Sequence, residues 1–155
     1  MLSDGPVVLG VPWHPDERLI RTGAELASMM GAHLVCAFVD PTSYLTEWEP
    51  ETLRTAASLD PAPVHETAFP VSAILECLRK ILGAPGHDWS FRVLNGDVAQ
   101  ALTRLAESTN ASVLIVGGQR PGSLAGMARL LEGSVSLSLI RSQPRPVVVV
   151  PHLGS

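Results

Sequence analysis

Short apolar runs alternate along the chain with longer segments in which apolar residues recur at helical spacing. The runs are rich in β-branched residues and too short for helices, so they predict strands buried in a sheet. The predicted strands are residues 7–11, 33–39, 89–94, 113–116 and 146–150. Residues 89–94 alternate apolar with polar side chains, which is typical of an edge strand.

Capping residues mark the ends of the predicted helices. Asp16 and Glu17 lie at the start of a first helix, where the helix dipole favours carboxylates, and Gly31 ends that helix. Asp97 caps another helix, with Asn110 as its left-handed C-cap. Between them, Ser72 predicts the start of a helix that ends at Gly83.

The stretch before this helix is different in character. Residues 42–70 carry four prolines in a polar context with little periodicity, and they predict a long crossover.

Strands that alternate with helices predict right-handed βαβ crossovers and a mostly parallel sheet with helices on both faces. The fold class is therefore α/β, a doubly wound, Rossmann-like sheet. With 155 residues, 46% of them hydrophobic, we expect residues 1–155 to form one domain. Ligands of such sheets bind beyond the carboxyl ends of the strands, so the loops after Val11 and Val116 are the candidate site.

The loop after residues 113–116 is rich in glycine and leads into a helix that Ser134 is expected to cap. Backbone N–H groups of such a loop can approach an anion closely, and the helix start adds unpaired donors. The lysine of a P-loop and a G-x-G-x-x-G pattern are both missing. The segment therefore predicts either a phosphate site of another kind or a flexible crossover.

Charge and composition exclude several classes of function. The net charge is −4 and no basic run occurs, which argues against a nucleic-acid partner. No apolar run approaches about 18 residues and the amino terminus lacks a charged leader, so we expect a soluble, cytoplasmic protein and no membrane contact. Cys36, Cys77 and the five histidines are dispersed, so no metal site is expected.

The chain resembles the universal stress protein family over nearly its whole length. The segments that carry the likeness are VVLGVP, LVCAFVDP, NGD, VLIVGG, GSVS and RPVVVVP. The resemblance implies strand order 3-2-1-4-5, a homodimer, and a stress-response module that binds an adenine nucleotide such as ATP. It implies no dedicated catalysis and no catalytic residues, with Mg²⁺ present only together with the nucleotide.

Matching the family motifs residue by residue implies a set of nucleotide-binding residues. Val11, Pro12 and Val39 would line the base. The phosphate side would comprise Gly117, Gly118, Gly122, Gly133, Ser134, Val135 and Ser136.

Two departures from the family pattern favour an alternative. The spacing is Gly117-x4-Gly122-x10-Gly133-Ser134, where the family resembles G-x2-G-x9-G-[ST]. The first strand ends in Val11-Pro12-Trp13-His14, where ATP-binding members resemble V-D-G-S. Trp13 then either stacks on a bound ring or fills the vacated space. The alternative function is a member that has lost the nucleotide and acts as a dimeric interaction scaffold.

The last predicted strand also predicts how a dimer would form. In strand order 3-2-1-4-5, taken from the resemblance, it lies at an edge of the sheet, where unpaired backbone groups invite a partner strand. Pro146 and Pro151 bracket the run but leave its centre free to pair. We expect a homodimer through Val147, Val148, Val149 and Val150.

Overall fold

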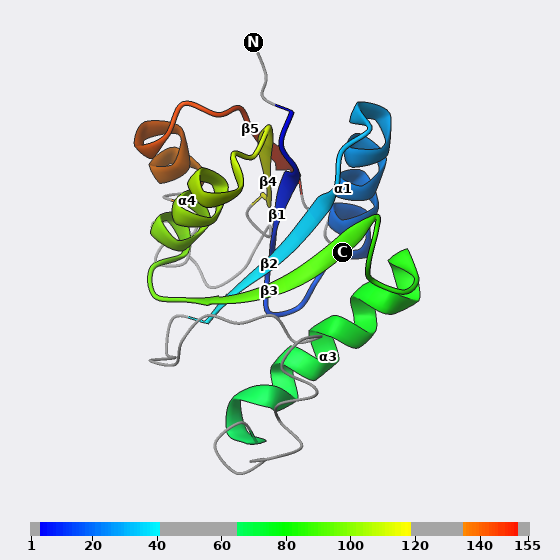
Figure 1. Cartoon of the computed structure of the whole chain (residues 1–155). Coiled ribbons are helices and arrows are strands. Elements are labelled where there is room, and N and C mark those ends of the chain that lie inside the picture. The colour runs from blue at the N-terminus through cyan, green and yellow to red at the C-terminus, as the bar shows by residue number, and fades with distance from the viewer. Residues whose placement is uncertain (1–3, 41–64, 119–134, 152–155) are drawn as a thin grey trace.

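The computed structural model describes residues 4–40, 65–118 and 135–151. A parallel five-stranded sheet lies at the centre of this part of the chain (Figure 1). Its strands are β1 (Val7–Val11), β2 (Leu34–Asp40), β3 (Trp89–Asn95), β4 (Val113–Gly117) and β5 (Val147–Val150). Their order is β3-β2-β1-β4-β5, which confirms the predicted fold class and topology.

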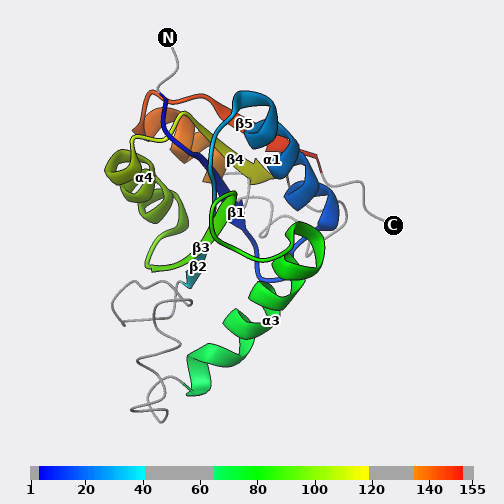
Figure 2. The same cartoon turned by 45° about the vertical axis from the view of Figure 1, so that its right-hand side comes forward.

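Helices cover both faces of the sheet. Figures 1 and 2 show α1 (Glu17–Met30) and α3 (His65–Leu82) on one face. The other face carries α4 (Val98–Thr109) and the helical residues 135–142. Because successive residues of a strand point to opposite faces, each strand contributes to two separate cores.

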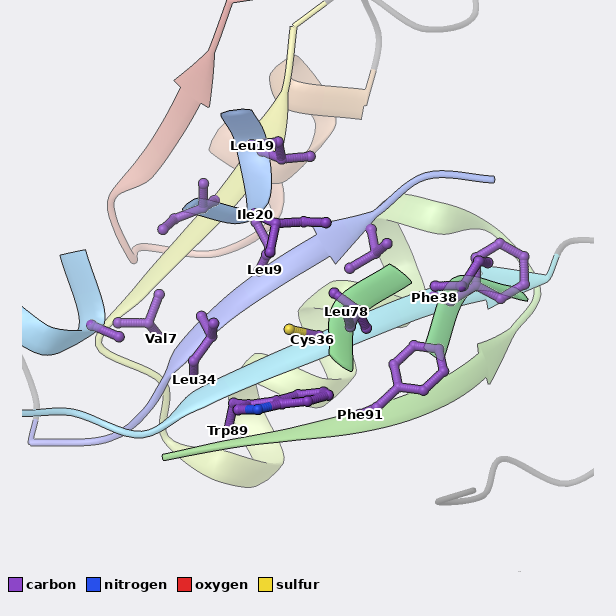
Figure 3. Packing of buried hydrophobic residues seen from close by; sticks show 14 of the residues in the cluster. Val7, Leu9, Leu19, Ile20, Leu34, Cys36, Phe38, Leu78, Trp89 and Phe91 are labelled. Carbon is purple, nitrogen blue, oxygen red and sulfur yellow. The ribbon is translucent and has the colours of Figure 1, made fainter. Parts of the chain in front are cut away.

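The core beneath α1 and α3 is the larger and contains the aromatic residues of the sheet. Figure 3 shows Trp89 and Phe91 on β3, with Phe38 at the carboxyl end of β2. The core beneath α4 is aliphatic, with Val8 and Leu114 of the sheet buried together with Leu102. Both cores depend on the all-apolar strands that the sequence pattern predicts.

The structure confirms the predicted positions of four helix ends. Asp16 accepts from the Arg18 amide at the start of α1, and Gly31 ends that helix in the left-handed conformation at φ 64°. Asp97 accepts from the Gln100 amide at the start of α4, and Asn110 ends it at φ 52°.

The predicted start of α3 is wrong. The helix begins at His65 and contains Pro70, whereas the sequence pattern predicts a start at Ser72. Proline in the second turn removes one N–H from the helix ladder, which a long helix tolerates when its later turns are well packed. That packing is present, because Val71, Ile74 and Leu78 are buried against the sheet. Of the predicted crossover, residues 42–64 lie outside the described residues.

Candidate functional site

The candidate site lies at the carboxyl ends of β1 and β4, which are neighbours in the sheet. The chain leaves β1 toward α1 on one face, whereas the helical residues 135–142 that follow β4 in sequence lie on the other face. Two neighbouring strands whose connections diverge in this way form the switch point at which α/β sheets bind ligands. The fold therefore places the predicted loops together at one edge.

The residues predicted to line a base lie at this edge, but they do not form one surface. Val11 belongs to the core beneath α1 and α3, whereas Val39 belongs to the core beneath α4. Their side chains thus point to opposite faces, and Pro12 is exposed in the loop between β1 and α1. The side chains of Val11, Pro12 and Val39 therefore do not form one pocket for a base.

The backbone carbonyl of Val39 is better placed than its side chain to contact a ligand at the end of β1. Val11 pairs with Phe38, so β2 continues beyond the last residue of β1. The Asp40 carbonyl accepts from the Gly96 amide at 3.3 Å on the β3 side, and backbone groups alternate along a strand. The Val39 carbonyl therefore points toward the side of β1, at the level where β1 has ended.

Gly118 has a structural role that the glycine pattern does not reveal. Its amide donates to the Val150 carbonyl at 2.6 Å, which extends the pairing of β4 with β5. A Cβ at this position would lie 3.2 Å from the same carbonyl oxygen and 3.3 Å from the Pro151 Cα. The Gly118 amide is thus already engaged, so it is a poor donor for a phosphate.

Gly117 is different because protein packing does not require glycine there. It is exposed, and an added Cβ would meet the Leu19 Cδ2 at 3.5 Å, an ordinary contact. Of the other predicted phosphate residues, Gly122, Gly133 and Ser134 lie outside the described residues. Val135 packs partly against the core beneath α4, and Ser136 beside it is half-buried, both among the helical residues 135–142.

Two of the helices that start near this edge, α1 and α4, carry a capping carboxylate at their first turn. Asp16 accepts the Arg18 amide at 3.0 Å at the start of α1, and Asp97 accepts the Gln100 amide at 3.0 Å at the start of α4. Each carboxylate satisfies an N–H group of the first turn and repels negative charge. The starts of α1 and α4 are therefore unfavourable places for a phosphate.

For Trp13 the sequence leaves two roles open, stacking on a bound ring or filling the space of the missing aspartate. Its ring lies 5.7 Å from the Phe38 ring at an interplanar angle of 53°, yet 52% of the residue is exposed. The indole therefore covers Phe38 without being buried itself. Sequence alone could not pair these rings, because the pairing depends on the register of β1 and β2.

Asp40 was also missed as a feature of this edge. It is a buried carboxylate at the end of β2, next to Val39. The available signal in the sequence is the Asp40-Pro41 step that follows the apolar run of residues 33–39.

The described residues contain neither a candidate metal site nor a candidate membrane span. Within them, no three His, Cys, Asp or Glu side chains gather in a group that could hold a metal ion. No helix in this part of the chain is long and apolar enough to cross a membrane. Cys36 is fully buried and Cys77 partly buried, both in the core beneath α3, as the sequence predicts.

Comparison with known proteins identifies a family and a fold. A sequence profile described as the universal stress protein family matches residues 6–151. A comparison with curated protein sequences gave no significant match.

Several solved structures share the fold. A universal stress protein in complex with cAMP is 20% identical, with a TM-score of 0.59 over 96% of this chain and 98% of that chain. The Archaeoglobus fulgidus universal stress protein in complex with dAMP is 20% identical, with a TM-score of 0.58 over 97% and 99%. UspA from Lactobacillus plantarum is 18% identical, with a TM-score of 0.56 over 96% and 99%.

Proposed function

The chain belongs to the universal stress protein family, and from this premise we propose that it is a stress-response or regulatory module that binds an adenine nucleotide. The nucleotide would lie at the carboxyl edge of the sheet. ATP is the expected ligand, accompanied by Mg²⁺, and the module would carry out no dedicated catalysis.

The observation that carries the proposal is the geometry of the switch point between β1 and β4. Asp16 and Asp97 make the starts of α1 and α4 unfavourable for an anion. We infer that the phosphate lies instead near Val135 and Ser136, among the helical residues that follow β4 in sequence. The Val39 carbonyl beyond the end of β1 offers an acceptor for the amino group of an adenine. Base and phosphate would then bind to different strands across one edge.

The chemical class of ligand also has support from similar structures. Two universal stress proteins of the same fold were solved with cAMP and with dAMP. Both ligands combine an adenine with a phosphate, and both structures align with nearly the whole of this chain. An adenine nucleotide is therefore the class to test first.

A second candidate function is an interaction scaffold that has lost the nucleotide. Two observations favour it. The loop after β1 carries Pro12-Trp13-His14 in place of an aspartate motif. The Gly118 amide donates its hydrogen bond to the Val150 carbonyl and is not available to a phosphate. In this case the homodimer alone would carry the function.

We also propose a homodimer through β5, which is compatible with either function. Among the strands of the described residues, β5 pairs only with β4 and lies at the edge of the sheet. Val149 is 44% exposed there, and Leu137 and Ile140 on the last helix are exposed apolar residues one turn apart. An antiparallel pairing of two β5 strands, Val147 to Val150, about a two-fold axis would cover the exposed Val149 and the partly exposed Val147 and Val148.

Adding Mg-ATP should raise the melting temperature of the purified chain. A ligand that binds the native state alone adds about 2.7 kcal/mol to the free energy of unfolding at a hundredfold excess over its dissociation constant. The measurement is thermal unfolding followed by circular dichroism, with MgCl₂ alone as the control. An unchanged melting temperature at millimolar ATP, together with a stable dimer, would contradict the nucleotide proposal and favour the scaffold.

A further inference from the structure

We propose that Trp13 holds the base of the bound nucleotide by stacking, in place of polar contacts from the loop after β1. This inference rests on the proposed function, because it assigns a residue to the same site. It concerns a side chain that the family motifs do not place there. The site thereby takes a planar aromatic base on an indole surface.

The position of Trp13 supports this assignment. It lies two residues beyond Val11, at the carboxyl edge where β1 ends next to β2 and β4. The backbone carbonyl of Val39 points from β2 toward the side of β1, as the pairing of Asp40 with Gly96 indicates. A base between the indole and this carbonyl would be stacked on one side and hydrogen-bonded at its edge.

The indole is supported from below and open above. The centroids of the Trp13 and Phe38 rings lie 5.7 Å apart. Phe38 is only 3% exposed and lies near the carboxyl end of β2, in the core beneath α1 and α3 (Figure 3). The 52% of Trp13 that remains exposed is therefore available to a ligand. A residue that merely filled the space of a missing carboxylate would be buried.

The loop that carries Trp13 is restrained before any ligand binds. Pro12 and Pro15 flank it, and each fixes its own φ angle and restricts the residue that precedes it. Asp16 caps α1, which Leu19 and Ile20 anchor in the core. A restrained aromatic residue loses little conformational entropy when a ring stacks on it.

The side chains of this loop leave stacking as the main available interaction. Pro12 and Pro15 carry no polar side-chain atoms, and the Asp16 carboxylate accepts the Arg18 amide. His14 is exposed and adjacent to Trp13. Stacking of a base on an aromatic side chain is strong and tolerates different bases, because every base presents a π face.

The test compares two ligands on the wild type and three variants of the full chain by isothermal titration calorimetry. Mg-ATP probes base and phosphate together, whereas magnesium tripolyphosphate probes the phosphate side alone. Trp13→Leu keeps an apolar side chain without a π face, and Trp13→Phe keeps a π face. Met29→Ala serves as the control, because Met29 is an exposed apolar residue at the far end of α1.

We expect Trp13→Leu to weaken Mg-ATP binding by about 5- to 150-fold, the range typical of losing one base-aromatic stack. Trp13→Phe should retain affinity within about fivefold of the wild type, since its ring still stacks. The affinity for tripolyphosphate should be the same in all forms. Quenching of the Trp13 emission by ATP, taken as the difference between wild-type and Trp13→Phe spectra, gives the same information if Trp13→Leu fails to fold.

The outcomes separate this inference from the proposed function. Equal ATP affinity in Trp13→Leu and wild type, or equal weakening of both ligands, would overturn the stacking role while the nucleotide site stands. Absence of quenching in the difference spectrum at saturating ATP would overturn it as well. A wild-type chain that binds neither ligand would overturn the proposed function and the stacking role together.

Discussion

Replacing Gly5 by alanine is expected to lower the free energy of unfolding by at least about 3 kcal/mol, or to prevent folding. A Cβ at this position would lie 1.8 Å from the Asn110 carbonyl oxygen and 2.6 Å from its carbonyl carbon. Both are backbone atoms, so no side-chain rotation can relieve the clash.

The backbone around Gly5 is also unable to move easily. The Ser112 amide donates to the Pro6 carbonyl at 2.8 Å, which ties the start of β1 to the start of β4. On the other side, Asn110 is held in the left-handed conformation as the C-cap of α4. Relief of the clash would break one of these contacts.

Urea unfolding of the variant measures this effect. Gly117→Ala is the matched control, because its Cβ would make an ordinary 3.5 Å contact with Leu19, and we expect a change within about 0.5 kcal/mol. Stability of Gly5→Ala close to that of the wild type would show that the segment before β1 packs differently in solution.

Replacing Val149 by lysine is expected to convert the proposed dimer into monomers. Val149 is exposed at the free edge of the sheet, so the monomer can accommodate a lysine there. In a two-fold pairing of β5 strands, two such lysines would lie near each other, and like charges in an interface cost several kcal/mol. Val148 is a poorer choice, because it packs partly against the core beneath α1 and α3.

Size exclusion with light scattering measures the outcome. The wild type should have twice the chain mass of 16.5 kDa, and Val149→Lys should have the chain mass itself. Met29→Lys, which places the same charge on an exposed residue of α1, should remain a dimer. A wild-type monomer, or a Val149→Lys variant that still dimerises, would place any interface elsewhere.

Local sequence signals were sufficient for most of the fold. Apolar β-branched runs such as Val113 to Val116 have no alternative to a buried strand, and their alternation with helices leaves few topologies. The caps Asp16, Asp97 and Asn110 act within a few residues of chain, so their effect can be inferred locally. The start of α3 could not be inferred locally, because the burial of its later turns outweighs the helix-breaking effect of Pro70.

The candidate site depends on contacts between distant segments, and there the sequence was less informative. That Val11 and Val39 face opposite cores follows from the register of β1 with β2. The use of the Gly118 amide follows from the pairing of β4 with β5. The residues predicted to bind a nucleotide thus stay a prediction, refined by geometry that only the folded chain provides.

The proposed site for an adenine nucleotide lies at the carboxyl edge between β1 and β4. Its most direct test is a titration of the ¹⁵N-labelled chain with Mg-ATP, followed through the backbone amide signals. The signals of Val11, Trp13, Val39 and Gly117 are expected to shift together with a single dissociation constant. Unchanged signals at millimolar ATP, or shifts confined to the opposite edge around His33, would contradict it.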